Sequence, residues 1–264
     1  MFHFLTRDVS QQHIPICFAL DYGQAIGDRG NIEQDYIEIA FKDAEKCSYK
    51  TVFRSSQEIT DFCAAISAAG ALMFQTNYRD PYSIPTSGFS HKEESWCTPP
   101  TLKMFDNDEL MIASLKSYVE KIKKETQCKN REIAIITFDE SILYRSDELE
   151  SIIGKKVRLL KDRFSFEDII QDSTNDAVIL SSPYNINGLE FAGVILVGVD
   201  DGRVPQAKDV EDVSEHYIKY IAFNQLYLSS SRAKYRLVLL GNKLHGVSPC
   251  LEYAIESSRI VVEG

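Results

Sequence analysis

The sequence has few cysteines, no long hydrophobic run and fewer basic than acidic residues. Six cysteines are scattered over 264 residues without a CxxC pair, which disfavours a zinc site and predicts reduced thiols in a cytoplasmic protein. No apolar run approaches the ~18 residues of a membrane-spanning helix, and the N-terminus lacks the basic and apolar regions of a signal peptide. The net charge of −10 argues against nonspecific coating of nucleic acid but is compatible with a local basic groove.

The sequence also lacks a phosphate-binding loop of the form GxxxxGK[ST]. Its one Gly-Lys pair, Gly154-Lys155, is followed by Lys156 and has no glycine five residues earlier. Such a loop supplies the backbone donors and the lysine that hold the β- and γ-phosphates of a nucleotide. We therefore expect no ATP hydrolysis by this chain alone. The histidines form no metal-binding pattern, and no metal site is predicted.

What the chain does contain is an alternation of apolar strands and amphipathic helices. Strands that are apolar on both faces and alternate with helices predict an α/β fold with a mostly parallel sheet covered on both sides. In such a sheet, ligands are expected at the carboxyl ends of the strands. Strands are expected at 14–20, 131–138, 155–160, 176–182, 191–199 and 235–241, and helices from Ser55 or Ser56 onward and at 106–126, 146–153, 164–171 and 215–234.

One stretch interrupts this alternation. Residues 76–103 contain four of the eight prolines and little periodicity, so we expect a small irregular insertion or edge hairpin at about 76–105.

The segments that carry chemistry lie near strand ends. SSPYNINGLEF precedes the apolar strand FAGVILVGV, which is followed by DDGRVPQ and later by LYLSSSRAKYRLVL. Gly188 allows close approach of the backbone to a ligand, and Glu190 presents a carboxylate where the next strand begins. Arg232 joins a serine-rich helix end to a strand, and its planar, permanently charged fork suits phosphate better than a core.

Together these segments resemble the C-terminal half of the UvrD/Rep/PcrA-like superfamily 1 helicases. Four of that family's motifs are matched in order between residues 14 and 242. The matching residues are Asp21, Gln24, Ile26, Arg29 and Gly30 for motif III, Arg54, Ser55 and Ile59 for motif IV, Ser182, Gly188, Leu189, Glu190 and Phe191 for motif V, Gly198, Gly202 and Pro205 for the turn after it, and Leu226, Ser231, Arg232 and Ala233 for motif VI.

This resemblance implies a RecA-like, three-layer αβα domain at 51–264, preceded at 1–50 by the end of a first RecA-like domain and a linker. In that family ATP and Mg²⁺ lie between two such domains, and the missing first domain holds the phosphates. By resemblance, Arg54 and Arg232 contact the γ-phosphate as arginine fingers, Gln24 senses it, and Gly188 and Glu190 lie at the nucleotide. We expect Arg54, Glu190 and Arg232 to converge at one edge of the sheet.

The resemblance also implies a contact with single-stranded DNA through Ser182, Tyr184 and Asn187. Relatives have histidine and lysine where this chain has Tyr184 and Asn187, and an aromatic residue where it has Gly27, so weak binding is expected. The expected partners are single-stranded DNA and a phosphate-loop domain in cis or in trans. The alternative function is a degenerate, non-catalytic helicase-like module that binds a partner protein or DNA.

Simpler structural roles compete with several of these assignments. Arg232 could satisfy helix carbonyls, Arg54 could pair with Glu58, and Gly188 could serve only a tight turn. Likewise, Asp139-Glu140 after IAIITF resembles the carboxylates of a Mg²⁺ site, or starts a turn at the end of a strand.

Overall fold

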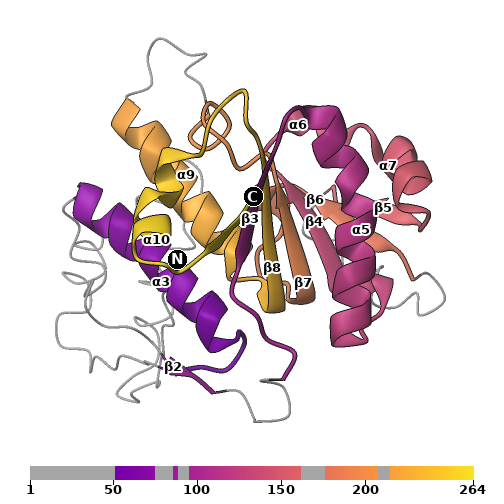
Figure 1. Cartoon of the computed structure of the whole chain (residues 1–264), viewed down its shortest axis with the longest axis horizontal. Coiled ribbons are helices and arrows are strands. Elements are labelled where there is room, and N and C mark those ends of the chain that lie inside the picture. The colour runs from indigo at the N-terminus through magenta and orange to yellow at the C-terminus, as the bar shows by residue number, and fades with distance from the viewer. Residues whose placement is uncertain (1–50, 75–85, 89–94, 162–175, 207–214) are drawn as a thin grey trace, which may run out of the picture.

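The structure is a computed structural model that describes residues 51–74, 86–88, 95–161, 176–206 and 215–264. Its centre is a seven-stranded sheet whose neighbouring strands all pair in parallel (Figure 1). In spatial order the strands are β5 (Val157–Leu159), β6 (Val178–Ser181), β4 (Ile133–Thr137), β7 (Phe191–Val197), β8 (Ala233–Asn242), β3 (Thr101–Phe105) and β9 (Val261–Glu263). A separate pair joins β1 (Thr51–Val52) to β2 (Thr86–Ser87).

The central strands are apolar on both faces. Every residue of β4, β6 and β7 is buried, as the continuous apolar runs predict for a parallel sheet between two helical layers. Alternate residues serve opposite faces: Ile136 and Leu196 belong to one core cluster, whereas Ile135 and Ile195 belong to the other.

Helices cover both faces of this sheet (Figure 1). One layer contains α3 (Gln57–Phe74), α9 (Glu215–Ser230) and α10 (Glu252–Glu256), and the other contains α5 (Asp108–Thr126), α6 (Glu140–Leu143) and α7 (Ser146–Ile153). Short 3₁₀ turns are η2 (Asn130–Glu132), η3 (Pro183–Asn185) and η4 (Pro249–Leu251). The predicted α/β, three-layer fold is confirmed.

Local signals in the sequence explain several helix ends. Ser56 Oγ accepts a hydrogen bond from Ile59 N and caps α3, and Asn107 accepts from Leu110 N and caps α5. Gly154 ends α7 with φ of 69°, a left-handed conformation that favours glycine. The predicted stop of this helix is confirmed.

The predicted irregular insertion at 76–105 extends too far. Its last five residues, Thr101–Phe105, form β3, which pairs with β8 on one side and β9 on the other. The strand expected at 14–20, the helix expected at 164–171 and the predicted remnant domain at 1–50 lie outside the described residues.

Two further observations concern the cysteines and the helices. The four cysteines in the described ranges, Cys63, Cys97, Cys128 and Cys250, form no disulfide bond. Of the helices in the described part of the chain, none is both long and apolar enough to span a bilayer.

Candidate functional site

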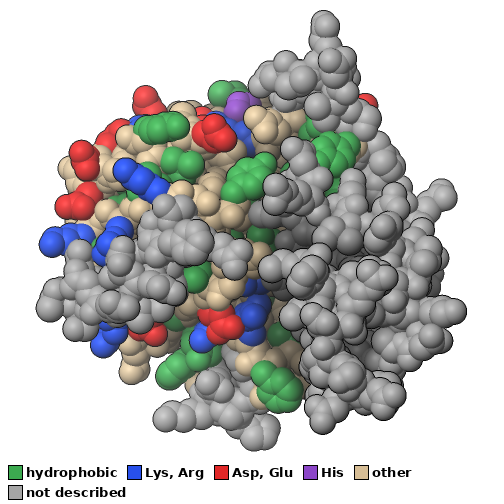
Figure 2. Space-filling model, turned by 180° about the vertical axis from the view of Figure 1, so that it is seen from behind, with side chains coloured by type: hydrophobic (Ala, Val, Ile, Leu, Met, Phe, Trp, Pro, Cys, Tyr) green, Lys and Arg blue, Asp and Glu red, His purple; other side chains and the backbone are tan. Residues whose placement is uncertain are grey.

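Three charged side chains meet at the edge where β7 and β8 begin. Arg54 follows β1, Glu190 precedes β7, and Lys234 is the second residue of β8. Arg54 Nε lies 2.7 Å from Glu190 Oε1, and Lys234 Nζ lies 3.1 Å from Glu190 Oε2. We call these three residues, together with Arg232, the amino edge. Figure 2 shows basic and acidic side chains next to one another in the lower half of that view, toward the end of the sheet where the strands begin.

Backbone hydrogen bonds bring these distant segments together. Ser56 N donates to Lys234 O at 2.9 Å, and Ser55 Oγ donates to Ala233 O at 2.7 Å. These two bonds fix the start of α3 against the start of β8. Phe191 N donates to Arg232 O at 2.9 Å, which fixes β7 against the same segment. The matches to motifs IV, V and VI therefore share one edge, although Arg54 and Glu190 are 136 residues apart.

At this edge one carboxylate, Glu190, is shared by two cations. Burial raises the pKa of Glu190, but the hydrogen bonds and charges of Arg54 and Lys234 outweigh it and hold that pKa below its usual value of 4.5. Glu190 is therefore ionised at neutral pH and shared by two cations. Because the Arg54 and Glu190 side chains are 32% and 37% exposed, a ligand can reach both.

Arg232 lies at the same edge but faces inward. It is fully buried, and its guanidinium donates to Leu228 O at 3.1 Å, Leu189 O at 3.3 Å and Ser231 Oγ at 3.0 Å. Burial, followed by the charge of Arg54, lowers the pKa of Arg232 to about 10. In this structure Arg232 thus satisfies carbonyls at the end of α9 and before β7, the simpler of the two roles that its sequence allows. Its contact with phosphate stays a prediction.

The other nucleotide-site predictions differ in outcome. Gly188 has φ of +84° and open space around the position of a Cβ, so the turn requires glycine for its conformation. Gln24 lies outside the described residues.

The predicted DNA-contact residues follow β6. Ser182 comes directly after this strand, Tyr184 lies in η3 with 53% of its surface exposed, and Asn187 is exposed further along the same loop. This loop leads from the carboxyl end of β6 to the amino end of β7. Ser182 and Tyr184 therefore lie toward the opposite edge of the sheet from Arg54, and their contact with DNA stays a prediction.

At that opposite edge, where the strands end, Arg203 joins three carboxylates. Its guanidinium contacts Asp108 at 2.5 Å, Asp139 at 3.2 Å and Asp200 at 3.0 Å, and these residues follow β3, β4 and β7. Asp200 is fully buried and also accepts from Asn242 N at 2.9 Å. We call Arg203 and its three carboxylates the carboxyl edge.

The expectation of ligands at the carboxyl ends of the strands stays a prediction. At the carboxyl edge the Arg203 guanidinium contacts side chains of the domain itself. Of the candidate residues, Arg54 and Glu190 meet instead at the amino edge. The sequence analysis missed Lys234 and the Arg203 network; the glycines and proline of GVDDGRVP were the available signal for the latter.

Electrostatic effects support a stable carboxyl edge. Burial opposes the charge of Asp108, but hydrogen bonds from Arg203 and Asn242 lower its pKa below the usual 3.8. Burial also disfavours charged Arg203, yet its three carboxylates raise the pKa of Arg203.

Asp139 serves the turn after β4. Its carboxylate accepts from Ser141 N at 2.9 Å and caps α6, in addition to the contact with Arg203. This agrees with the turn-starting role and offers no support for a Mg²⁺ site. Within the described ranges, no group of three or more histidine, cysteine or acidic side chains is arranged to hold a metal ion.

Comparisons with known proteins bear on the fold. No model of a known protein family matches the sequence, and no curated protein sequence matches it. The solved structure of the C-terminal domain of a possible DNA helicase from Lactobacillus plantarum WCFS1 is similar, with a TM-score of 0.51 and 19% identity over 80% of this chain and 99% of that chain.

Two other solved structures are similar over parts of the chain. One is S. tokodaii Xpd4, with a TM-score of 0.37 and 11% identity over 69% of this chain and 41% of that chain. The other is the C-terminal part of the Fun30 ATPase domain, with a TM-score of 0.31 and 14% identity over 74% of this chain and 64% of that chain. Those scores are too low to carry an argument. From the first similarity and the parallel sheet together, the chain has a RecA-like α/β fold like that of a helicase C-terminal domain.

Proposed function

We propose that this chain is the second RecA-like domain of a UvrD-like, ATP-dependent DNA helicase or translocase. In this role it completes an ATP site whose phosphate loop and Mg²⁺ ligands belong to another domain, in cis or in trans. The observation that carries the proposal is the meeting of Arg54 and Glu190 beside Arg232 and Lys234, from segments that are far apart in the sequence.

The chemistry of the amino edge fits a triphosphate. Two partly exposed cations share the single carboxylate of Glu190, so the edge has positive charge available for an anion. A γ-phosphate held by the neighbouring domain would compete with Glu190 for Arg54. A fixed guanidinium at the transferring phosphoryl group raises the rate by about 10³–10⁵ in well-studied enzymes.

The bound nucleotide supplies the reactive phosphoanhydride and its Mg²⁺. In the proposed site Arg54 binds and orients the γ-phosphate, and Glu190, once released from Arg54, accepts from a ribose hydroxyl. Arg232 sets the backbone of Leu189 just before Glu190 through its 3.3 Å hydrogen bond, and it would reach phosphate only after leaving these carbonyls. We also propose that Ser182, Tyr184 and Asn187 contribute to the single-stranded DNA surface.

A second candidate is a non-catalytic helicase-like module. It is favoured by the contacts of the two candidate fingers, since Arg54 is paired with Glu190 and Arg232 donates to carbonyls of the domain itself. Such a domain would be stable and complete by itself and would bind a partner protein or DNA.

Complementation separates the two candidates. ATP turnover is measured for this chain, for a phosphate-loop RecA-like domain, and for the two joined in one polypeptide or mixed. The proposal predicts no turnover by this chain alone, because it lacks the loop, and DNA-stimulated turnover by the assembly well above that of the phosphate-loop domain. An assembly that forms a stable complex yet hydrolyses ATP no faster than the phosphate-loop domain would establish the second candidate.

A further inference from the structure

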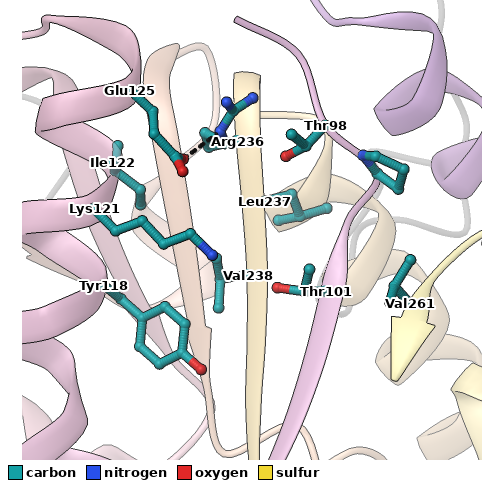
Figure 3. Close-up of a pocket in the computed structure, with 11 residues that line it drawn as sticks. Thr98, Thr101, Tyr118, Lys121, Ile122, Glu125, Arg236, Leu237, Val238 and Val261 are labelled. Atoms are coloured by element: carbon teal, nitrogen blue, oxygen red, sulfur yellow. Dashed lines mark hydrogen bonds and ion pairs between the residues drawn. The ribbon is translucent and has the colours of Figure 1, made fainter. Parts of the chain in front are cut away.

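A cavity of about 180 Å³ lies between α5 and the strands β8, β3 and β9 (Figure 3). Its apolar wall is formed by Pro99, Ile122, Leu237, Val238 and Val261. The polar groups that line it are Thr98, Thr101, Tyr118, Lys121, Glu125 and Arg236. None of these residues belongs to the amino edge or to the predicted DNA surface.

The size of the cavity suits one ring. An engineered cavity of about 150 Å³ with an apolar lining binds benzene. This cavity therefore has room for one aromatic side chain. Its apolar wall is aliphatic, with Tyr118 as the one aromatic lining residue, so it lacks the stacking platforms that proteins use for nucleobases.

Two cationic groups at the cavity have unused hydrogen-bonding capacity. Arg236 is 9% exposed; its Nε donates to Glu125 at 2.8 Å and its Nη1 to Tyr235 O at 3.2 Å, which leaves Nη2 without a partner among the described residues. The Lys121 side chain extends across the cavity (Figure 3). Within the described ranges, it forms no ion pair or hydrogen bond. Glu125 pairs with Arg236, and Glu263 of β9 accepts from the Tyr118 hydroxyl at 3.2 Å. A carboxylate on the ligand would pair with Lys121, which has no carboxylate within ion-pair distance among the described residues.

Among the described strands, the sheet ends beside this cavity. β9 is the outermost strand of the described sheet and pairs with β3 alone among the described strands. Val261 and Val262 of β9 are 50% and 51% exposed. An unpaired strand edge with apolar side chains is a template for a further strand from another polypeptide.

We propose that an extended segment of a partner polypeptide pairs with the free edge of β9 and inserts one aromatic side chain into this cavity. Neighbouring strands are ~4.8 Å apart, so a side chain must pass over Val261 to enter, which only a long side chain such as Phe or Tyr can do. A carboxylate two residues from the aromatic side chain lies on the same face of the segment and meets Lys121 and Arg236.

The test uses the whole chain, labelled with ¹⁵N, and the capped peptide acetyl-Asp-Thr-Phe-Thr-Asp-amide. Saturable NMR shift changes are expected at the amides of Ile122, Val238 and Val261. Replacing the peptide's Phe by Ala should weaken binding about tenfold or more, because a buried aromatic side chain contributes more than ~1.4 kcal/mol. Replacing both Asp by Asn should weaken it severalfold.

Matched variants of the chain test whether the positive charge of Lys121 at the cavity contributes to peptide binding. Lys121→Gln should reduce affinity severalfold, whereas Lys124→Gln, which removes an exposed lysine of the same helix that does not line the cavity, should leave it unchanged. Val261→Asp should abolish binding by placing a carboxylate at the entrance, and its half-exposed position allows the fold to tolerate the change. Thermal unfolding of each variant confirms that the fold is retained.

Several outcomes would overturn the proposal. These are shift changes that do not saturate, equal effects of Lys121→Gln and Lys124→Gln, or equal binding of the Asn-containing peptide. Free N-acetylphenylalanine that binds as tightly as the peptide would show that the β9 edge contributes nothing. An oligodeoxythymidine that displaces the peptide from the same amides would assign the cavity to nucleic acid.

Discussion

The two edges of the sheet each contain an arginine with little or no solvent exposure, and the two arginines differ in what surrounds them. Arg203 at the carboxyl edge is 14% exposed and contacts three carboxylates. Arg232 at the amino edge is fully buried and hydrogen-bonds to carbonyls and a hydroxyl. The pKa of Arg203 is raised by its partners, whereas burial lowers the pKa of Arg232 to about 10.

This difference indicates that the carboxyl edge stabilises the fold, whereas the amino edge is the one proposed to act on a ligand. The carboxyl edge balances Arg203 from within the domain, so it fastens together the ends of β3, β4 and β7. The amino edge has three cations, Arg54, Arg232 and Lys234, and the carboxylate of Glu190. An edge with surplus positive charge is costly for an isolated domain and suited to a domain that meets a triphosphate.

The largest change in stability is expected for Arg203→Met. Removal of this guanidinium leaves Asp108, Asp139 and Asp200 without the cation that they share, while the His245 ring stays 2.9 Å from Asp200. Breaking a buried ion pair costs about 3–5 kcal/mol. Urea denaturation at pH 7 should show this loss, and at pH 4 the variant should be closer to wild type because protonation removes the repulsion. A loss under ~1 kcal/mol would show that Arg203 does not hold this edge together.

A smaller change is expected for Arg232→Met. The variant loses hydrogen bonds to Leu228 O and Leu189 O but no longer buries a cation without a carboxylate partner. These effects oppose each other, so the free energy of unfolding should change by less than about 2 kcal/mol. The same urea titration measures it. A loss of unfolding free energy as large as that of Arg203→Met would mean that both arginines stabilise the fold. The two edges would then not differ in role.

The pH dependence of stability gives a further test of the carboxyl edge. The pKa of Asp108 is lower in the folded chain than its usual 3.8, so its contribution to stability is full above that value and is lost as pH falls through the lower, folded pKa. Asp108→Asn should therefore destabilise the chain at pH 7 and have little effect near pH 2. Denaturation midpoints across this range test it, and a constant difference at every pH would contradict the linkage.

The smallest effect concerns DNA. Asp108, Asp139 and Asp200 outnumber Arg203 at the carboxyl edge, and Ser182 and Tyr184 follow the end of β6 in the same sheet. Binding of single-stranded DNA by the isolated chain should therefore be weak and should fall steeply with salt. Tyr184→Ala should change it little. Fluorescence anisotropy with an oligonucleotide measures both, and nanomolar affinity that persists at high salt would contradict the expectation.

The sequence predicted the elements whose signals are local. Continuous apolar runs gave β4 and β7, and Gly154 gave the end of α7. β3 was misplaced because Thr101–Phe105 is short, follows two prolines and contains Lys103. Its place in the sheet is set by pairing with β8 and β9, which begin more than 130 residues further along the chain.

The candidate site was predictable in part. The motif-like segments named Arg54 and Glu190, and the structure brings them into contact. The sequence could not give the burial of Arg232, which depends on the packing of α9 against α3 and β7. Nor could it give the pairing of Lys234 with Glu190, or of Arg203 with carboxylates that follow three different strands. Those contacts exist only once the strands are in register.

The most direct test of the account compares Arg54→Gln with Lys234→Gln in the assembly with a phosphate-loop domain. Each change removes one cation from Glu190 at the amino edge, so the two variants are matched in local charge and exposure. Of these two residues, Arg54 alone is proposed to act on the γ-phosphate. We expect Arg54→Gln to lower ATP turnover at saturating ATP by about 10³-fold or more, with little change in ATP affinity. We expect Lys234→Gln to lower turnover less than about tenfold, which is the range of a lost surface ion pair. Equal turnover by the two variants would show that Arg54 serves only its ion pair with Glu190.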